Sequence, residues 1–518
     1  MHLALRSLLA VLVLSLGCGD DDGSTSDTTT DAPDRDSGSA PGVDGGTPDP
    51  RPVPVTTVGE LGLRPFDVNQ QDLVGPHQHA AMYGKTPEIV VEASGDGFDV
   101  LLQDHADGAG DAWLLRFERD GDDYVIVRAL EAPILDRIMG LARDEAGNLY
   151  VASGVDEAED VTVDYPAENE YRSGVVRVVK VDPEGRIAFD TDLDLAREAA
   201  GDDPEQLIKP MVASTARMAV GGGRVALVHG INTPPDGGGV RHQKAITTHL
   251  DASTGDVVRL SSMWVSHSFD QRVFHDGSGF MEMHLGDAYP RTIVTGRIGE
   301  ESSGSYALFH IKGSTGANNT HTRLGDFAPI EGDADFGYLA LFATERAEGT
   351  DPMGSHERIA GIRDLAIVRY RRDFESTDRD SDALLDSAMP DSMTVSSGGE
   401  TSTNTLRWLT DHQEESAATH AERPKLIALG DDTYLVLYER WSLAGDGYDF
   451  DGSWAMHIDH RGDAHHGPER VSDSHLPRGD DAFGLESGGA WLTGDQDDGE
   501  LTLHLVSPDL DYRAIVLE

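Results

Sequence analysis

Residues 229 to 291 contain many side chains of the types that can bind metal ions or anions. They are placed where short apolar runs begin or end. This group consists of His229, Asn232, His242, His267, Asp270, Arg272, His284, Asp287 and Arg291. Imidazole nitrogens together with a carboxylate suit a divalent transition metal. Guanidinium groups instead hold a carboxylate or a sulfate through paired hydrogen bonds.

The sequence leaves two interpretations of this group open. If His229 ends the second strand of one β unit, while His267 starts the next unit and His284 ends its second strand, the three converge at one end of a central channel and share a metal ion. The alternative is that these polar side chains join neighbouring units through buried hydrogen bonds. Glu439 ends the corresponding strand of a later unit, beside Arg440, and both interpretations apply to it.

A run of alternating carboxylates after residue 377 resembles a calcium-binding loop of the EF-hand or thrombospondin-repeat kind. Its candidate ligands are Asp378, Asp380, Asp382 and Asp386. Oxygen ligands at this spacing wrap around one Ca²⁺ ion. However, Ala383 replaces the expected glycine and Met389 replaces the bidentate glutamate. The sequence therefore establishes no cofactor and leaves Ca²⁺ and a divalent transition metal as the two candidates.

The sequence contains no motif of a catalytic nucleophile. It has no Gly-x-Ser-x-Gly, no His-Glu-x-x-His and no glycine-rich phosphate loop that leads into a helix. Such motifs are the sequence signs of hydrolases, metalloproteases and nucleotide-binding proteins. We therefore favour a ligand- or protein-binding module over an enzyme. The alternative function is an exported metal-dependent hydrolase or lyase that acts on carbohydrate.

The elements that position these residues are short strands. Apolar runs bounded by Gly, Asp and Pro dominate after residue 60, which is typical of strands and turns. One unit recurs, in which two strands joined by a tight Asp/Gly turn precede a third, alternating strand. The third strand has seven copies, which are Leu114–Phe117, Val179–Val181, Thr248–Leu250, Phe309–Ile311, Ile367–Tyr370, Met456–Ile458 and Leu503–Leu505.

Seven antiparallel units predict an all-β chain folded as a single β-propeller with seven blades. The copies are about 65 residues apart, more than in most propeller repeats, so several blades carry long insertions. The largest insertions lie around residues 371–420 and 441–453. A pair of β-sandwich domains is the alternative fold.

Four histidines take the same position in the recurring third strand. They are His249, His310, His457 and His504. Alternation places this position on a polar face of the strand. We therefore expect these histidines to have a structural role.

The clearest copy of the unit covers residues 140–153 and contains the pattern Asp-x-x-Gly-Asn-x-Tyr-Val, from Asp144 to Val151. This pattern resembles the repeat of bacterial NHL-like propellers, and the resemblance implies a β-propeller fold. It covers one unit closely and the other units in outline. The Trp-Asp dipeptide and the kelch signature of other propellers are absent.

The N-terminus resembles that of a bacterial lipoprotein precursor. Residues 1–17 combine Arg6, the apolar run Leu8–Leu14 and small residues before Cys18, as a signal peptide requires. Ser15-Leu-Gly-Cys18 is similar to a lipobox, in which the cysteine is acylated, although Ser15 replaces the preferred leucine. Residues 18–55 have the composition of a disordered acidic linker, and the propeller is expected at 56–518.

Composition restricts the partners of the protein. The net charge of −52 comes from 93 acidic and 41 basic residues, and it argues against nucleic acid and against anionic membrane surfaces. Cys18 is the only cysteine, so no disulfide stabilises the body. We expect a monomer that is exported to the cell envelope, at the outer membrane or cell surface. Its membrane contact would be the N-terminal lipid alone, and its partner a carbohydrate or protein ligand.

Overall fold

The computed structural model describes residues 57–65, 87–105, 111–135, 137–154, 176–193, 209–211, 216–232, 243–261, 270–286, 292–298, 303–310, 322–346, 362–372, 384–397, 400–412, 419–445, 447–477 and 481–517. Within these residues, one short 3₁₀ helix, η1 (Val58–Leu61), precedes thirty β-strands. No helix in this part of the chain is long and apolar enough to cross a membrane.

The strands form seven antiparallel sheets, each built from strands that are consecutive in the chain. Blade 1 contains β1 (Ile89–Ser94), β2 (Gly97–Asp104), β3 (Asp111–Asp120) and β4 (Asp123–Glu131). Blade 2 contains β5 (Arg137–Arg143), β6 (Leu149–Gly154), β7 (Val176–Val181) and β8 (Ile187–Leu193). Blade 3 contains β10 (Arg217–Gly221), β11 (Arg224–Asn232), β12 (Gln243–Asp251) and β13 (Val257–Ser261), and the short β9 (Lys209–Met211) pairs with β11.

Blades 4 to 7 continue this order. Blade 4 contains β14 (Gln271–His275), β15 (Phe280–Gly286), β16 (Thr292–Ile298) and β17 (Ser303–His310). Blade 5 contains, from the inside outward, β18 (Arg323–Pro329), β19 (Phe336–Glu345), β20 (Arg363–Arg371), β22 (Glu400–Trp408) and β21 (Asp391–Ser397). Blade 6 contains β23 (Thr419–Gly430), β24 (Thr433–Ala444), β25 (Gly447–Asp459) and β26 (Ala464–Ser472). Blade 7 contains β27 (Phe483–Leu485), β28 (Gly488–Asp495), β29 (Glu500–Val506) and β30 (Tyr512–Leu517).

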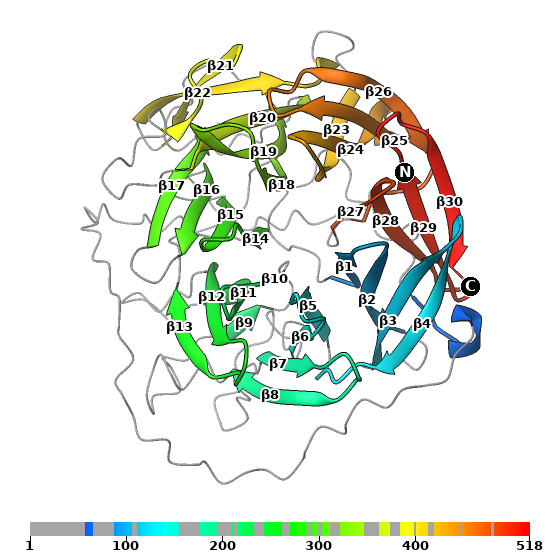
Figure 1. Ribbon diagram of the computed structural model, residues 1–518. Helices are drawn as coiled ribbons and strands as arrows, with labels where there is room; N and C mark the ends of the chain where they lie inside the picture. The colour runs from blue at the N-terminus through cyan, green and yellow to red at the C-terminus, as the bar shows by residue number, and fades with distance from the viewer. Residues whose placement is uncertain are drawn as a thin grey trace, which may run out of the picture. The chain divides into compact units, whose positions relative to one another are not determined.

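The seven sheets surround a central axis as the blades of a propeller. Figure 1 shows β1, β5, β10, β14 and β18 near the centre and β4, β8, β13, β17 and β30 at the periphery. The fold is therefore all-β with seven blades, as the sequence predicts, and it excludes the pair of β-sandwich domains. Since each blade begins with its innermost strand, all inner strands begin at the same end of the propeller, which we call the upper end.

The structure corrects one of the seven predicted third strands. Phe309 and His310 end β17, which is the fourth strand of blade 4, whereas the third strand is β16. In β16 the polar residue near the turn is Arg297 rather than a histidine. The prediction is wrong here because β17 has the same apolar–histidine pattern as third strands elsewhere. His310 therefore does not share the position of His249.

The predicted insertions extend two blades. In blade 5, the hairpin of β21 and β22 lies within residues 371–420, and β22 pairs with β20 through Ala366 with Trp408 and Ile367 with Arg407. In blade 6, residues 441–453 continue the hairpin of β24 and β25, whose ladder runs to Ala444 and Gly447. The described parts of both insertions therefore add β-structure to their blades.

The hydrophobic core lies between blades. One cluster joins blades 1 and 7 through Phe98 and Phe483, whose ring centroids are 5.4 Å apart. Another joins blades 4 and 5 through Phe309 and Phe342, at 4.4 Å. Within the described ranges no such cluster joins blades 3 and 4. Instead, the hydroxyl of Thr247 in blade 3 donates to buried Glu282 in blade 4, at 2.6 Å.

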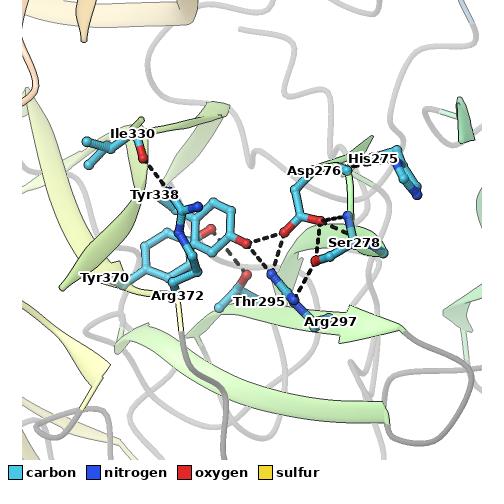
Figure 2. Close-up of polar contacts among 11 residues, drawn as sticks. His275, Asp276, Ser278, Thr295, Arg297, Ile330, Tyr338, Tyr370 and Arg372 are labelled. Carbon is cyan, nitrogen blue, oxygen red and sulfur yellow. Dashed lines mark hydrogen bonds and ion pairs between the residues drawn. The ribbon is translucent and has the colours of Figure 1, made fainter. Parts of the chain in front are cut away.

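Polar joints near the turns supplement this core. Figure 2 shows the Tyr338 hydroxyl of blade 5 directed toward Asp276 and Arg297 of blade 4. Tyr338 donates to Asp276 Oδ2 at 2.5 Å and accepts from Arg297 at 2.6 Å. Its ring stacks on Tyr370, whose hydroxyl lies 3.4 Å from Thr295. This joint connects the turn after β14 to the second strand of the next blade.

Candidate functional site

Charged residues stand where inner strands begin. Arg217 is the first residue of β10, Arg272 is the second residue of β14, and Arg323 is the first residue of β18. Because these strands begin at the same end, the three guanidinium groups lie at the upper end of neighbouring blades 3, 4 and 5. Arg217 and Arg272 are buried.

Asp481 links two of these arginines from the far side of the propeller. It lies just before β27 in blade 7, and both of its oxygens contact Arg217 of blade 3. The distances are 2.5 Å from Arg217 Nε to Oδ2 and 2.7 Å from Nη2 to Oδ1. Asp481 Oδ1 is also 3.8 Å from Arg272 Nε in blade 4. Since blade 7 does not adjoin blade 3 or blade 4, this contact crosses the central axis.

Further charges complete what we call the central ion cluster, which consists of Arg217, Asp270, Arg272, Asp326, Lys425 and Asp481. Arg272 pairs with Asp270 and, at 2.6 Å from Nε to Oδ1, with Asp326. Asp326 stands at an irregularity of the ladder between β18 and β19, where the register shifts. Lys425 in β23 is buried, and it follows a similar register shift at Arg423, whose φ is 48°. These irregularities place charges on the inner strands of blades 5 and 6.

The charged residues of the central ion cluster shift one another's pKa values. Burial opposes ionisation of Asp481, but Arg217, Arg272 and Lys425 outweigh it and hold the pKa of Asp481 at about 2. Burial lowers the pKa of Lys425, while Asp481 and Asp326 oppose this shift. Asp481 is therefore a permanent anion at neutral pH.

Glu92 on β1 shows the opposite behaviour. Its side chain is partly exposed, yet burial, followed by the nearby charges of Asp99 and Asp481, raises its pKa to about 8. Asp99 stands directly opposite Glu92 in the ladder of blade 1. Like charges at such a position repel each other, so Glu92 is mainly protonated at pH 7.

A second group of charges lies at the upper ends of blades 5 and 6. Glu422 of β23 accepts from Arg323 Nε at 2.7 Å and pairs with Arg363 through its other oxygen. Arg363 N donates to His420 Nδ1 at 3.3 Å, and His420 Nε2 lies 3.0 Å from the hydroxyl of Tyr448. These contacts tie blade 5 to the upper end of β23.

Glu439, a candidate from the sequence, is fully buried and accepts four hydrogen bonds. They come from Arg423 at 3.2 Å, His475 at 3.1 Å, the indole of Trp441 at 2.8 Å and the backbone N–H of Leu476 at 2.9 Å. Burial raises its pKa, but Arg423 and these hydrogen bonds lower it more. Glu439 thus anchors the segment after β26 to β24, which is the contact pattern of a structural residue.

His229 of blade 3 does not point toward His284, which lies in β15 of blade 4. Thr247 pairs with Val228 in the β11–β12 ladder, so their side chains share one face. Thr247 contacts Glu282, whose other oxygen is 3.0 Å from His284 Nε2, so this face meets blade 4. His229 follows Val228 and must point to the face that meets blade 2. The structure therefore does not bring these two histidines together around one ion.

His229 itself is neutral. It is buried, and its Nδ1 lies 2.9 Å from the carbonyl oxygen of Gly230, so Nδ1 carries the proton. Burial lowers its pKa to about 4. In the described part of the chain, no three His, Cys, Asp or Glu side chains are arranged to hold a metal ion.

The remaining candidates have different positions. Asp270 and Arg272 lie together in the central ion cluster. Asp386 accepts from Arg369 Nη1 at 2.7 Å. Asn232 pairs with Gln243 in the ladder between β11 and β12. The candidates outside the described residues are Cys18, His242, His267, Asp287, Arg291, Asp378, Asp380 and Asp382.

Sequence reasoning missed four members of the central ion cluster, namely Arg217, Asp326, Lys425 and Asp481. One local signal existed for Lys425, which lies between Pro424 and the apolar run Leu426-Ile-Ala428 in a chain with few lysines. Asp481 had no such signal, because its partner Arg217 is 264 positions away.

Comparison with known proteins assigns the chain to no family. No protein-family model matches the chain, and a comparison with the sequences of characterised proteins gives no match. In structure it is similar to Trypanosoma rangeli sialidase in complex with the inhibitor DANA, at 12% identity and a TM-score of 0.35, covering 78% of this chain and 59% of that chain. It is also similar to the β-propeller domain of the Trilobed protease from Pyrococcus furiosus, at 7% identity and a TM-score of 0.34, covering 85% and 94%. A third similar structure is Penicillium chrysogenum α-L-arabinanase complexed with arabinobiose, at 12% identity and a TM-score of 0.33, covering 56% and 77%.

Proposed function

We propose that the protein is a ligand-binding β-propeller, exported and held at the cell envelope by a lipid on Cys18, with the central ion cluster as its binding site. The observation that carries the proposal is the cluster itself. Five blades contribute charged side chains to it, and the side chain of Asp481 is 36% exposed while those of Arg217 and Arg272 are only 9% and 6% exposed. A ligand at the upper end would therefore meet preorganised charges.

Several properties of the cluster favour binding over catalysis. Arg272 is held by Asp270 and Asp326, and both oxygens of Asp481 contact Arg217. Because the pKa of Asp481 is about 2, this residue has no proton to donate at neutral pH. Preorganised charged hydrogen-bonding groups instead give affinity and orientation to a bound ligand.

Ligand binding can be tested with thermal melts of the purified protein in a panel of mono- and oligosaccharides and short peptides. A ligand that binds only the folded state raises the melting temperature. We expect at least one such shift, and we expect Arg272→Ala to abolish it. Arg119→Ala, an exposed arginine on β3, is the matched control and should keep the shift. A shift that survives Arg272→Ala would refute the central ion cluster as the site.

The anchor has a separate test in membrane fractionation of a bacterial host. Cys18→Ala removes the acceptor of the lipid, so the variant should leave the membrane fraction or accumulate as unprocessed precursor. Ser15→Leu restores the residue that a lipobox prefers and should stay in the membrane fraction. An unchanged membrane fraction for Cys18→Ala would contradict lipid anchoring.

A carbohydrate hydrolase is the second candidate, and the state of Glu92 favours it. A carboxyl group with a pKa of about 8 is protonated at neutral pH, as a general acid for glycoside cleavage must be. Release of nitrophenol from a panel of nitrophenyl glycosides would measure this activity. We would then expect Glu92→Gln to abolish turnover and Arg119→Ala to preserve it. Equal turnover by Glu92→Gln would remove this candidate.

A further inference from the structure

Asp481 binds Arg217 as a ligand carboxylate would. Its two oxygens face Nε and Nη2 of one guanidinium group, at 2.5 and 2.7 Å. This paired arrangement is the geometry in which arginine recognises carboxylates. The nearer oxygen also lies 3.8 Å from Arg272 Nε, so the carboxylate is placed between two buried arginines of neighbouring blades.

The position of Asp481 in the chain allows it to be replaced. It belongs to no strand and precedes Phe483, the first residue of β27. Its withdrawal would therefore break no hydrogen bond of a β-ladder. It is also the most exposed member of the ion pairs that it forms, so a carboxylate arriving from solvent would approach the arginines from its side.

The charges of the cluster require an anion at this place. Arg217, Arg272 and Lys425 are three cations, and Asp270, Asp326 and Asp481 are three anions. Arg217, Arg272 and Lys425 each stabilise the charge of Asp481, so its withdrawal would remove an anion that these buried cations share. Because an uncompensated buried charge is costly, the site would then favour binding of another carboxylate.

We infer that Arg217 and Arg272 form a binding site for the carboxylate group of a ligand, and that Asp481 occupies this site in the unliganded protein. The inference rests on the proposed function and names the ligand class, a compound with a free carboxylate such as a sugar acid. Asp481 is then an internal competitor, and it lowers the apparent affinity by the fraction of molecules in which it occupies the site.

The test is isothermal titration of the whole purified protein with D-galacturonate, with D-galactose as the matched sugar without a carboxylate and sulfate as a different anion. Asp481→Ala should bind D-galacturonate about tenfold more tightly than the unmodified protein, because the competitor is gone. The affinity for D-galactose and the affinity for sulfate should not increase to the same extent. Adding Arg217→Ala to Asp481→Ala should remove the gain.

Asp123→Ala is the matched control, since this exposed aspartate also pairs with an arginine, Arg513 at 2.9 Å. It removes the same charge and should leave the affinity for D-galacturonate unchanged. If Asp481→Ala does not fold, Asp481→Asn keeps the shape of the side chain and removes its charge. Folded Asp481→Asn or Asp481→Ala without a gain would overturn the inference and make Asp481 a structural tie across the axis.

The two proposals fail in distinguishable ways. If the thermal shift from the panel of ligands is lost in Arg272→Ala while the Asp481 variants bind D-galacturonate no better, only the carboxylate inference fails. If Arg272→Ala leaves every shift unchanged and the Asp481 variants show no gain, the central ion cluster is not a binding site at all.

Discussion

At the scale of single residues, Glu92 makes stability depend on pH. Its pKa is about 8 in the folded protein and ordinarily about 4.5, so the folded state holds a proton that the unfolded state loses. This contribution to stability is complete below pH 4.5 and is lost as the pH rises toward 8. Glu92→Gln removes this dependence. The variant should match the unmodified protein at pH 4.5 and exceed it increasingly up to pH 8.

Thermal melts of both proteins between pH 4.5 and 8.5 would measure the difference. Glu118→Gln is the control, because this glutamate is exposed on the neighbouring β3 and its substitution should give a nearly constant offset. A Glu92→Gln offset that does not grow with pH would show that Glu92 is ionised in the folded protein. That result would also weaken its candidacy as a proton donor.

At the scale of elements, local turn chemistry is what the sequence reveals best. Asp144 accepts from the backbone and the side chain of Asn148, at 2.9 and 2.7 Å, and Gly147 takes a φ of 86°. These requirements lie within five residues, so the hairpin of β5 and β6 could be predicted. The place of a strand within its blade depends on residues farther apart in the sequence. The pattern at Phe309 therefore predicts a third strand, whereas Phe309 belongs to β17, the fourth strand of blade 4.

The joint in Figure 2 gives a prediction at this scale. Tyr338→Phe removes the hydroxyl that donates to Asp276 and leaves a carboxylate with one partner fewer. Hydrogen bonds to charged groups contribute about 1.5–3 kcal/mol, against about 0.5–1.5 kcal/mol for neutral ones. Tyr434→Phe is the matched control, because the hydroxyl of Tyr434 donates to a neutral carbonyl, that of Pro329, at 2.7 Å.

Urea denaturation would give the free energy of unfolding of both variants. We expect Tyr338→Phe to cost about 2 kcal/mol and Tyr434→Phe about 1 kcal/mol. The opposite order would mean that the ion pair of Asp276 and Arg297 compensates fully for the lost hydroxyl. Loss of activity or binding without loss of stability would instead give this joint a role that its geometry does not suggest.

At the scale of the whole molecule, the site depends on closure of the ring. Asp481 and Arg217 meet only because blades 7 and 3 face the same axis, and nothing in either local sequence indicates this. The same long-range dependence explains why His229 and His284 do not meet, although the sequence places both at strand ends of neighbouring blades. Successive side chains of β11 point to opposite faces of the blade, so Val228 and His229 face different neighbouring blades. The order of the strands alone therefore does not determine which neighbouring blade a given side chain faces.

Closure itself has a structural weakness between blades 7 and 1. Within the described residues, the sheet of blade 7 consists of β27 to β30, and no other described strand pairs into it. The two blades are joined by side chains, mainly the cluster around Phe98 and Phe483 and the exposed pair of Asp123 and Arg513. An exposed ion pair contributes only about 0–1 kcal/mol, so the hydrophobic cluster, which also includes Val58 and Leu63 before blade 1, carries most of the closure.

Phe483→Ala should therefore destabilise the protein by about 3–5 kcal/mol and should do so by opening the ring locally. Native-state hydrogen exchange would detect this opening as faster exchange of amides in β1 and β27, with little change in β18 and β23. Phe342→Ala is the control, because it makes a similar cavity between blades 4 and 5, far from the closing interface. If Phe483→Ala accelerates exchange uniformly in all blades, the ring unfolds as one unit. If it accelerates exchange only in β1 and β27, the ring opens first between blades 7 and 1, and Asp481 is drawn away from Arg217 in the same event.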